Sequence, residues 1–139
     1  MSILLVGTGY MGKEYAKVLK AMKLPFVAVG RSQNSSDAFT AEIGVKAESG
    51  GLSVWLKKNK VPDKAIVAVT EDQLGITTRQ LIKAGCKEIL VEKPGGFDIK
   101  DIKSVATEAK KYKAKVFVGY NRRFYASTMT ALDIIKKED

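Results

Sequence analysis

The sequence has a single cysteine, no histidine and no long hydrophobic run. Cys86 alone cannot form an internal disulfide, which favours a reducing compartment. The apolar runs fall far short of the roughly 20 residues that a membrane-spanning helix needs. No basic segment and no small-residue cleavage site accompany the first apolar run, so a signal peptide is not expected either. These absences predict a soluble, cytoplasmic protein without membrane partners.

The composition is that of one globular domain. The chain has 139 residues, of which 45% are hydrophobic and 28% charged, a balance that supports a buried core. A net charge of +9 suits nucleic acid, a membrane surface or an anionic cofactor. No nucleic-acid motif is present, and the lysines recur at positions typical of solvated helix faces, namely Lys13, Lys17, Lys20, Lys100, Lys103, Lys110, Lys111 and Lys113. We therefore expect no nucleic-acid partner.

Short apolar segments alternate with helical patterns along the whole chain. Strands are expected at residues 3–6, 26–29, 45–47, 65–69, 88–91 and 116–119. Helices are expected at residues 10–22, 51–56, 72–84, 98–112 and 126–137, with another that follows a loop at residues 32–36 and ends near Gly44. This alternation predicts an α/β fold with a doubly wound, mostly parallel Rossmann sheet of about six strands in the order 3-2-1-4-5-6.

One predicted helix has both a cap and an apolar face. Asp98 is the expected N-cap of the helix at residues 98–112. Five of its residues recur at helical spacing on one side: Ile99, Ile102, Val105, Ala106 and Ala109. The pattern predicts an amphipathic helix with these residues on one face.

The segment from Ile3 to Gly12 reads I-L-L-V-G-T-G-Y-M-G, a strand followed by G-x-G-x-x-G at the mouth of a helix. In this context Gly7 permits the tight turn, Gly9 lets a pyrophosphate approach the backbone, and Gly12 lets the helix pack closely on the strand. The helix N-terminus offers free N–H groups to phosphates. We expect residues Gly7, Thr8, Gly9, Tyr10, Met11 and Gly12 to bind a dinucleotide; the alternative is a purely structural turn.

The end of the second strand bears on which dinucleotide is bound. NAD-binding domains usually carry Asp or Glu about 20 residues after the glycine turn, where it accepts hydrogen bonds from ribose hydroxyls. Here the strand ends Val29-Gly30-Arg31-Ser32 without an acid. Arg31 can pair with a 2′-phosphate and Ser32 can donate to it. The residues favour NADP(H), with NAD(H) still possible; the alternative is that Arg31 is an ordinary loop residue.

Two further motifs carry a family resemblance. Val91-Glu92-Lys93-Pro94 follows the fifth strand, and Gly119-Tyr120-Asn121-Arg122-Arg123-Phe124 follows the sixth. Together with the glycine turn, they resemble the N-terminal half of the glucose–fructose oxidoreductase/inositol dehydrogenase (Gfo/Idh/MocA) family over essentially the whole chain. The resemblance implies a catalytic Lys93 close to the nicotinamide. Glu92 would fix the loop or orient that lysine; in the alternative, the two side chains only pair on the surface.

The stretch after the fourth strand departs from the family pattern of T-P-N followed by histidine. Thr70 agrees, but Glu71 and Asp72 replace proline and asparagine, and Gly75 falls near the histidine position. We still expect Thr70 and Asp72 beside the cofactor, although Asp72 could instead cap the next helix. The resemblance also implies that Asn121 and Arg123 lie near the active site.

The family's substrate pocket belongs to a C-terminal domain, which supplies a histidine or similar proton-transfer group. The sequence therefore predicts a Rossmann domain at residues 1–124 and, at 125–139, the start of a linking helix toward an absent substrate domain. The expected activity is hydride transfer between nicotinamide and a sugar, cyclitol or nucleotide-sugar substrate. The alternative is a stand-alone dinucleotide-binding or sensing module without turnover. A homo-oligomer, or a partner that supplies the missing domain, remains open.

Overall fold

A computed structural model describes residues 2–138. Six strands form one sheet in the order β3-β2-β1-β4-β5-β6, and every neighbouring pair is parallel. The strands are β1 (Ile3–Val6), β2 (Phe26–Val29), β3 (Ala47–Glu48), β4 (Lys64–Val67), β5 (Glu88–Glu92) and β6 (Lys115–Gly119). The predicted doubly wound Rossmann sheet is confirmed.

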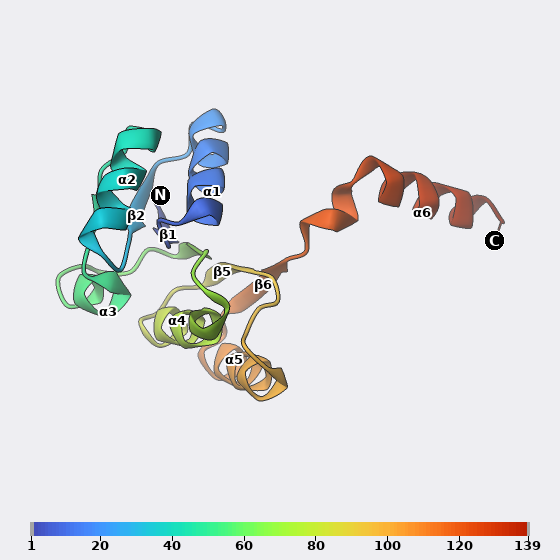
Figure 1. Cartoon of the computed structure of the whole chain (residues 1–139). Helices are drawn as coiled ribbons and strands as arrows, with labels where there is room; N and C mark the ends of the chain where they lie inside the picture. Colours follow the sequence, from blue (N-terminus) through green and yellow to red (C-terminus); the bar gives the residue numbers. More distant parts are fainter. Residues whose placement is uncertain (1, 139) are drawn as a thin grey trace.

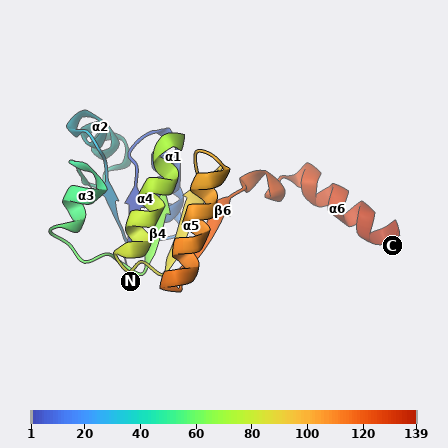
Figure 2. The same ribbon diagram turned by 90° about the horizontal axis from the view of Figure 1, so that it is seen from below.

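Helices cover the two faces of the sheet (Figures 1 and 2). One face carries α1 (Tyr10–Ala21) and α2 (Gln33–Ile43), and the other carries α3 (Gly51–Leu56), α4 (Glu71–Lys83) and α5 (Ile99–Tyr112). The short 3-10 helix η1 (Asn121–Phe124) and then α6 (Ala126–Glu138) follow β6. Each strand alternates its side chains between the faces, so Leu5 packs with α1 and α2, whereas Leu4 and Val6 pack toward α3 and α4.

Several predicted segments differ from the observed ones at their ends, and two of the differences bear on the strand and helix that follow β2. The serine-rich stretch at residues 32–36 is not a loop, because Ser32 is the N-cap of α2 and its side chain accepts a hydrogen bond from the Ser35 N–H at 3.3 Å. Serine favours the cap as well as the loop, which is why composition alone misplaced the helix start. The third strand is Ala47–Glu48 and not residues 45–47.

Helix α5 begins as predicted, but its apolar side is only partly covered. Asp98 is the N-cap, and its carboxylate accepts a 2.7 Å hydrogen bond from the Asp101 N–H. Val105 is buried and Ala109 half-buried, whereas Ile99 and Ile102 are 69% and 41% exposed. The predicted apolar face is therefore buried only around Val105 and Ala109. The helix lies at the end of the sheet beside β6, where α4 covers only one flank.

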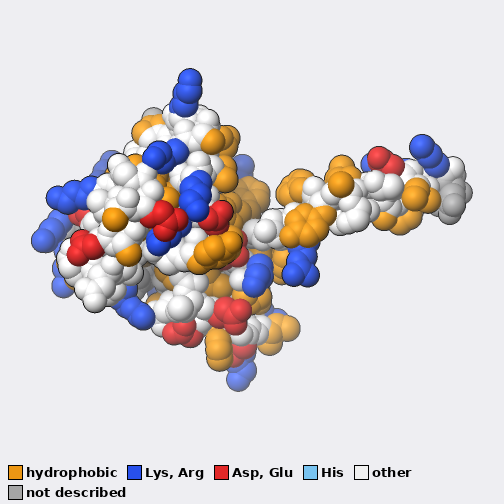
Figure 3. All heavy atoms as spheres, turned by 45° about the horizontal axis from the view of Figure 1, so that its top comes forward, with side chains coloured by type: hydrophobic (Ala, Val, Ile, Leu, Met, Phe, Trp, Pro, Cys, Tyr) orange, Lys and Arg blue, Asp and Glu red, His pale blue; other side chains and the backbone are white. Residues whose placement is uncertain are grey.

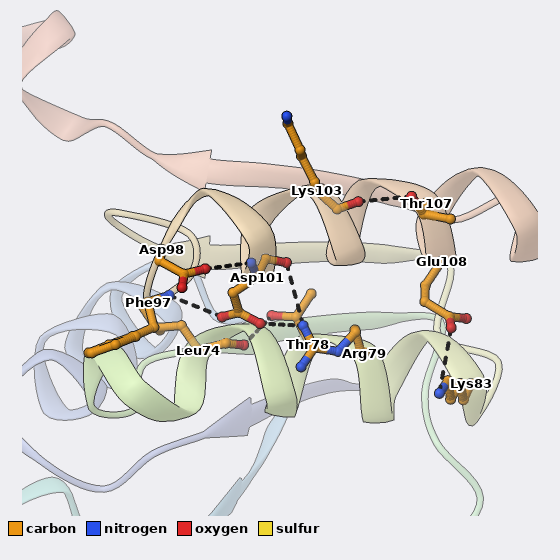
Figure 4. A network of polar contacts seen from close by, with 10 residues as sticks. All are labelled: Leu74, Thr78, Arg79, Lys83, Phe97, Asp98, Asp101, Lys103, Thr107 and Glu108. Carbon is orange, nitrogen blue, oxygen red and sulfur yellow. Dashed lines mark hydrogen bonds and ion pairs between the residues drawn. The ribbon is translucent and has the colours of Figure 1, made fainter.

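A polar network joins α4 to α5 (Figure 4). Arg79 of α4 forms an ion pair with Asp101 of α5, and Asp101 also accepts a 3.0 Å hydrogen bond from the Phe97 N–H. Burial alone would raise the pKa of Asp101, but Arg79 and the Phe97 N–H hold it below its ordinary value. A Cβ at Gly75 would collide with the Asp101 carboxylate. Gly75 thus makes room for this ion pair.

Helix α6 projects away from the body of the molecule (Figures 1 and 2). Its apolar residues Met129, Leu132, Ile134 and Ile135 are 44–57% exposed, and Figure 3 shows hydrophobic side chains along it. The same view shows Lys and Arg side chains spread over the body and not gathered in one patch. No helix within residues 2–138 is both long and apolar enough to cross a membrane.

Candidate cofactor site

The glycine turn lies where the strand order reverses, at the carboxyl ends of β1 and β4. Open α/β sheets bind ligands at such a crevice. Gly7 has φ +118°, a conformation that L side chains rarely adopt, and a Cβ there would also collide with the Ala68 carbonyl. Only glycine therefore lets the chain turn sharply out of β1 beside β4.

Gly9 and Gly12 serve the turn in different ways. Gly12 lies in the first turn of α1, and a Cβ there would collide with the Gly7 carbonyl, so its role is close packing. Gly9 is the N-cap of α1 and has ordinary extended backbone angles, and nothing lies within 4 Å of the place where its Cβ would be. No side chain caps this helix end, and its first turn holds no acid. The N–H groups are therefore available to an anion in open space.

A cleft of about 620 Å³ extends from this turn across the ends of β1, β2 and β4. Eight of the predicted binding residues line it: Gly7, Thr8, Gly9, Tyr10, Met11, Arg31, Ser32 and Thr70. Gly12 is buried beneath the turn. Asp72, Glu92, Lys93, Asn121 and Arg123 do not line the cleft.

Hydroxyl groups gather where β2 ends. The Thr8 hydroxyl donates to Ser35 Oγ at 3.0 Å, and the Ser32 hydroxyl donates to the same oxygen at 2.9 Å. Arg31 is exposed beside them at the mouth of α2, whose first turn holds no acid. Glu48, at the end of β3, accepts a 3.0 Å hydrogen bond from Trp55 Nε1. Its carboxylate is thus directed toward α3.

Sequence reasoning missed part of the cleft. Ser35, Gln73, Gln80 and the pair Gly50-Gly51 line it as well. Both glycines have positive φ, and the Gly51 N–H donates to the Gly30 carbonyl at 2.9 Å, which brings α3 against the end of β2. The paired glycines were a usable signal of a special backbone, whereas Gln73 and Gln80 lie on α4 and line the cleft only because of the way the chain folds.

Thr70 and Asp72 lie at the start of α4. Thr70 is the N-cap, so the alternative that Asp72 caps this helix is wrong. Hydrogen bonds from the Thr70 and Gln73 side chains lower the pKa of Asp72, and the charge of Arg31 contributes in the same direction. Asp72 is exposed and ionised at neutral pH, and it places a negative charge beside the cleft opposite Arg31.

The turn after β5 continues the same carboxyl edge of the sheet. Glu92 is 8% exposed, and its Oε1 accepts a 2.7 Å hydrogen bond from the Tyr15 hydroxyl of α1. Lys93 is exposed, the Lys93–Pro94 peptide is cis, and the Gly95 N–H donates to the Glu92 carbonyl at 2.9 Å. No ion pair joins Glu92 and Lys93 among the described residues, so the surface-pair alternative is wrong.

Asn121 and Arg123 lie in η1, directly after β6, and both are exposed. The Arg123 guanidinium lies 5.5 Å from the centre of the Phe124 ring. Because β4, β5 and β6 are neighbours in a parallel sheet, Thr70, Lys93 and Asn121 follow the same edge in that order. The sheet therefore aligns the predicted residues along one edge, and only those near β1, β2 and β4 share the cleft.

A dinucleotide fits this donor set. Its pyrophosphate would meet the free N–H groups at the start of α1, in the space that Gly9 leaves open. The cleft volume lies within the usual range for small-molecule sites. Within residues 2–138, no group of three His, Cys, Asp or Glu residues could hold a metal ion.

A parallel sheet in the order 3-2-1-4-5-6, with a glycine turn and a helix N-terminus at the switch point, defines a dinucleotide-binding domain. Comparison with known families agrees, because the model of the oxidoreductase family with an NAD-binding Rossmann fold (GFO_IDH_MocA) matches residues 1–120. The chain belongs to this family. No curated protein matches the sequence.

Solved structures share the fold at low identity. The WlbA dehydrogenase from Chromobacterium violaceum, in complex with NADH and UDP-GlcNAcA, matches with a TM-score of 0.84 and 17% identity over 99% of this chain. A putative myo-inositol dehydrogenase from Sinorhizobium meliloti matches with a TM-score of 0.80 and 23% identity over 99% of this chain. The UDP-N-acetylglucosamine 3-dehydrogenase GnnA from Acidithiobacillus ferrooxidans matches with a TM-score of 0.80 and 16% identity over 96% of this chain. The matches span 40%, 41% and 41% of those chains.

Proposed function

We propose that this chain is the cofactor-binding domain of an NADP(H)-dependent oxidoreductase acting on a sugar, cyclitol or nucleotide-sugar hydroxyl or carbonyl group. The observation that carries the proposal is the unblocked N-terminus of α1 beside Gly9, on the same sheet edge as Lys93. Solved neighbours described as acting on UDP-sugar and inositol substrates support the substrate class.

The preference for NADP(H) rests on the end of β2. A 2′-phosphate there would meet the Arg31 guanidinium, the hydroxyls of Ser32 and Ser35, and the N-terminus of α2. A carboxylate suited to ribose hydroxyls is absent from residues 30–33, and Glu48 is hydrogen-bonded to Trp55. The hydrogen-bond donors at this position therefore favour a phosphate over a bare ribose.

Lys93 is proposed as the polar partner of the substrate. Bound nicotinamide supplies the hydride acceptor or donor. The Lys93 ammonium would donate a hydrogen bond to the reacting substrate oxygen and stabilise the negative charge that develops there. Thr70, Asp72, Asn121 and Arg123 are proposed as the neighbours of the nicotinamide half along this edge. A substrate domain beyond residues 125–139 would supply the remaining groups.

Titration of the purified chain with NADPH and NADH, by calorimetry or nicotinamide fluorescence, tests this proposal. We expect both to bind, with NADPH about ten-fold tighter because of charge-assisted hydrogen bonds to the extra phosphate. Equal dissociation constants would remove the NADP(H) preference while leaving the domain assignment. Absence of binding by either dinucleotide would overturn the assignment itself.

A stand-alone dinucleotide-binding or sensing module is the second candidate. The chain spans about two fifths of the length of its solved neighbours. Incubation of the chain and NADP⁺ with a panel of sugars and cyclitols distinguishes the two. Reduction of NADP⁺ by the chain alone would favour a complete enzyme; tight binding without turnover favours a cofactor domain or a module. The cytoplasmic location and the oligomeric state stay predictions.

A further inference from the structure

Three elements converge on the Glu92 side chain. Tyr15 of α1 donates a 2.7 Å hydrogen bond to Glu92 Oε1, across 77 residues of sequence. Glu92 is the last residue of β5 and pairs with Gly119, the last residue of β6. Its side chain is almost completely buried. A buried carboxyl without a partner is costly, so the Tyr15 hydroxyl has a defined role at this point.

Gly119 leaves little space around this contact. A Cβ at Gly119 would lie 3.1 Å from the Tyr15 hydroxyl and 3.3 Å from Glu92 Oε1. Both distances are shorter than ordinary van der Waals contacts, so a side chain there would push the hydroxyl and the carboxyl apart. Burial and the hydrogen bond to Glu92 also raise the pKa of Tyr15, which keeps the phenol protonated as the donor.

Glu92 also holds the backbone of the turn that contains Lys93. The Glu92 carbonyl accepts the Gly95 N–H at 2.9 Å and closes the turn that contains Lys93 and Pro94. The hydrogen bond between the Glu92 side chain and Tyr15 thus fixes the beginning of this turn, and the hydrogen bond between the Glu92 carbonyl and the Gly95 N–H fixes its end. Lys93, which is itself exposed, follows directly from the anchored residue.

We propose that Tyr15 is a positioning residue for Lys93: its hydroxyl fixes the Glu92 carboxyl and thereby holds the turn that presents the Lys93 ammonium at the nicotinamide end of the cofactor edge. The inference rests on the proposed function. It extends that function to α1, whose first turn binds the pyrophosphate while its second turn would set the position of the reactive lysine. Tyr15 acts through Glu92 and does not itself touch the cofactor.

The test compares two ligands that differ only at the nicotinamide end. NADPH carries the nicotinamide ring, and 2′-phospho-ADP-ribose lacks it. The dissociation constant of 2′-phospho-ADP-ribose divided by that of NADPH therefore measures the contribution of the ring. We expect Tyr15→Phe to lower this ratio by about five-fold, the factor typical of one intramolecular hydrogen bond. The dissociation constant of 2′-phospho-ADP-ribose should stay within two-fold of the unaltered chain. Tyr112→Phe, on the exposed end of α5, is the matched control and should change neither value.

A double-mutant cycle shows whether Tyr15 acts through Lys93. In the Lys93→Ala background, Tyr15→Phe should have no further effect on the ratio, because the group that it positions is gone. Gly119→Ala, which crowds the same hydrogen bond, should shift the ratio in the same direction as Tyr15→Phe. These comparisons separate positioning from a general loss of stability, which would weaken both ligands alike.

Two outcomes would overturn the inference alone. One is an unchanged ratio of dissociation constants in folded Tyr15→Phe. The other is that Tyr15→Phe lowers this ratio as much in the Lys93→Ala background as in the unaltered chain. A different outcome concerns the proposed function. If the unaltered chain binds both ligands equally, or binds neither, nicotinamide is not held at Lys93, and the positioning role fails with it. Circular dichroism of each variant confirms that the chain is folded before the ratio is measured.

Discussion

Replacement of Gly9 by aspartate should separate cofactor binding from folding. Gly9 is the N-cap of α1 with φ −77° and ψ −167°, and no atom lies within 4 Å of the position of its missing Cβ. An aspartate can adopt this backbone and fill only open space. Its carboxylate would then occupy the place proposed for the pyrophosphate, and would itself cap the free N–H groups of the helix.

The substitution Gly9→Asp should raise the stability of the chain and weaken its binding of NADPH. Aspartate caps a helix better than glycine and restricts the unfolded chain, so the free energy of unfolding should rise by up to about 1 kcal/mol. The added charge lies at roughly 5 Å from the phosphates, where repulsion at an effective dielectric constant near 20 costs about 3 kcal/mol. That energy weakens NADPH binding by about 100-fold. The Gly9→Asp variant should therefore be at least as stable as the unaltered chain, although it binds NADPH far more weakly.

Thermal unfolding and NADPH titration of the same samples measure both effects. Gly12→Ala is the contrasting variant, because its Cβ would collide with the Gly7 carbonyl and should cost about 1–3 kcal/mol of stability. An unchanged NADPH dissociation constant for Gly9→Asp would show that the phosphates do not lie at the start of α1. A fall in its melting temperature as large as that of Gly12→Ala would show that the space beside Gly9 is not open.

Three further predictions concern other parts of the molecule. Arg31→Ala should weaken NADPH about ten-fold and leave NADH within two-fold; equal losses for both, measured by calorimetry, would exclude contact with a 2′-phosphate. Asp101→Asn should cost about 2 kcal/mol at neutral pH by breaking the partly buried pair with Arg79. Folding lowers the pKa of Asp101, so the stabilisation that its carboxylate provides is complete above the ordinary aspartate pKa and is lost as the pH falls through the lower folded value. The free energies of unfolding of the unaltered chain and Asp101→Asn, measured by chemical denaturation, should therefore converge in acid. A difference that stays constant with pH would contradict the ion pair. Cys86 is 1% exposed and burial raises its thiol pKa to about 11, so a disulfide reagent at pH 8 should label it only after unfolding; rapid labelling of the native chain would show that the α4–β5 region opens readily.

The order of the sheet was predictable because its signals are local. Each strand is a short apolar run, each crossover is long enough for a helix, and right-handed connections leave few arrangements. The errors fell where one residue type serves two structures. Serines at 32–36 were consistent with a loop, yet Ser32 caps α2. Ile99 and Ile102 have core-like spacing, yet α5 lies at the end of the sheet and leaves them exposed.

The candidate site was predictable only in part. The roles of Gly7 and Gly12 follow from backbone geometry, and the structure agrees with both. The hydrogen bond between Tyr15 and Glu92 could not be expected, since 77 residues separate the two and Tyr15 reads simply as an apolar position on α1. The reason for glycine at position 75 is equally invisible in sequence, because Asp101 fills that space from another helix.

The sequence by itself determined the fold class, the glycine turn and the family motifs, because strand periodicity, glycine spacing and a strand-end lysine are properties of neighbouring residues. Only the tertiary structure decided which side chains meet. It brought Ser35 and the Gly50-Gly51 pair to the cleft, directed Glu48 toward Trp55, and joined α1 to Glu92, the residue before Lys93. Such contacts depend on how helices pack across the sheet, and packing is set by shape and burial over the whole molecule.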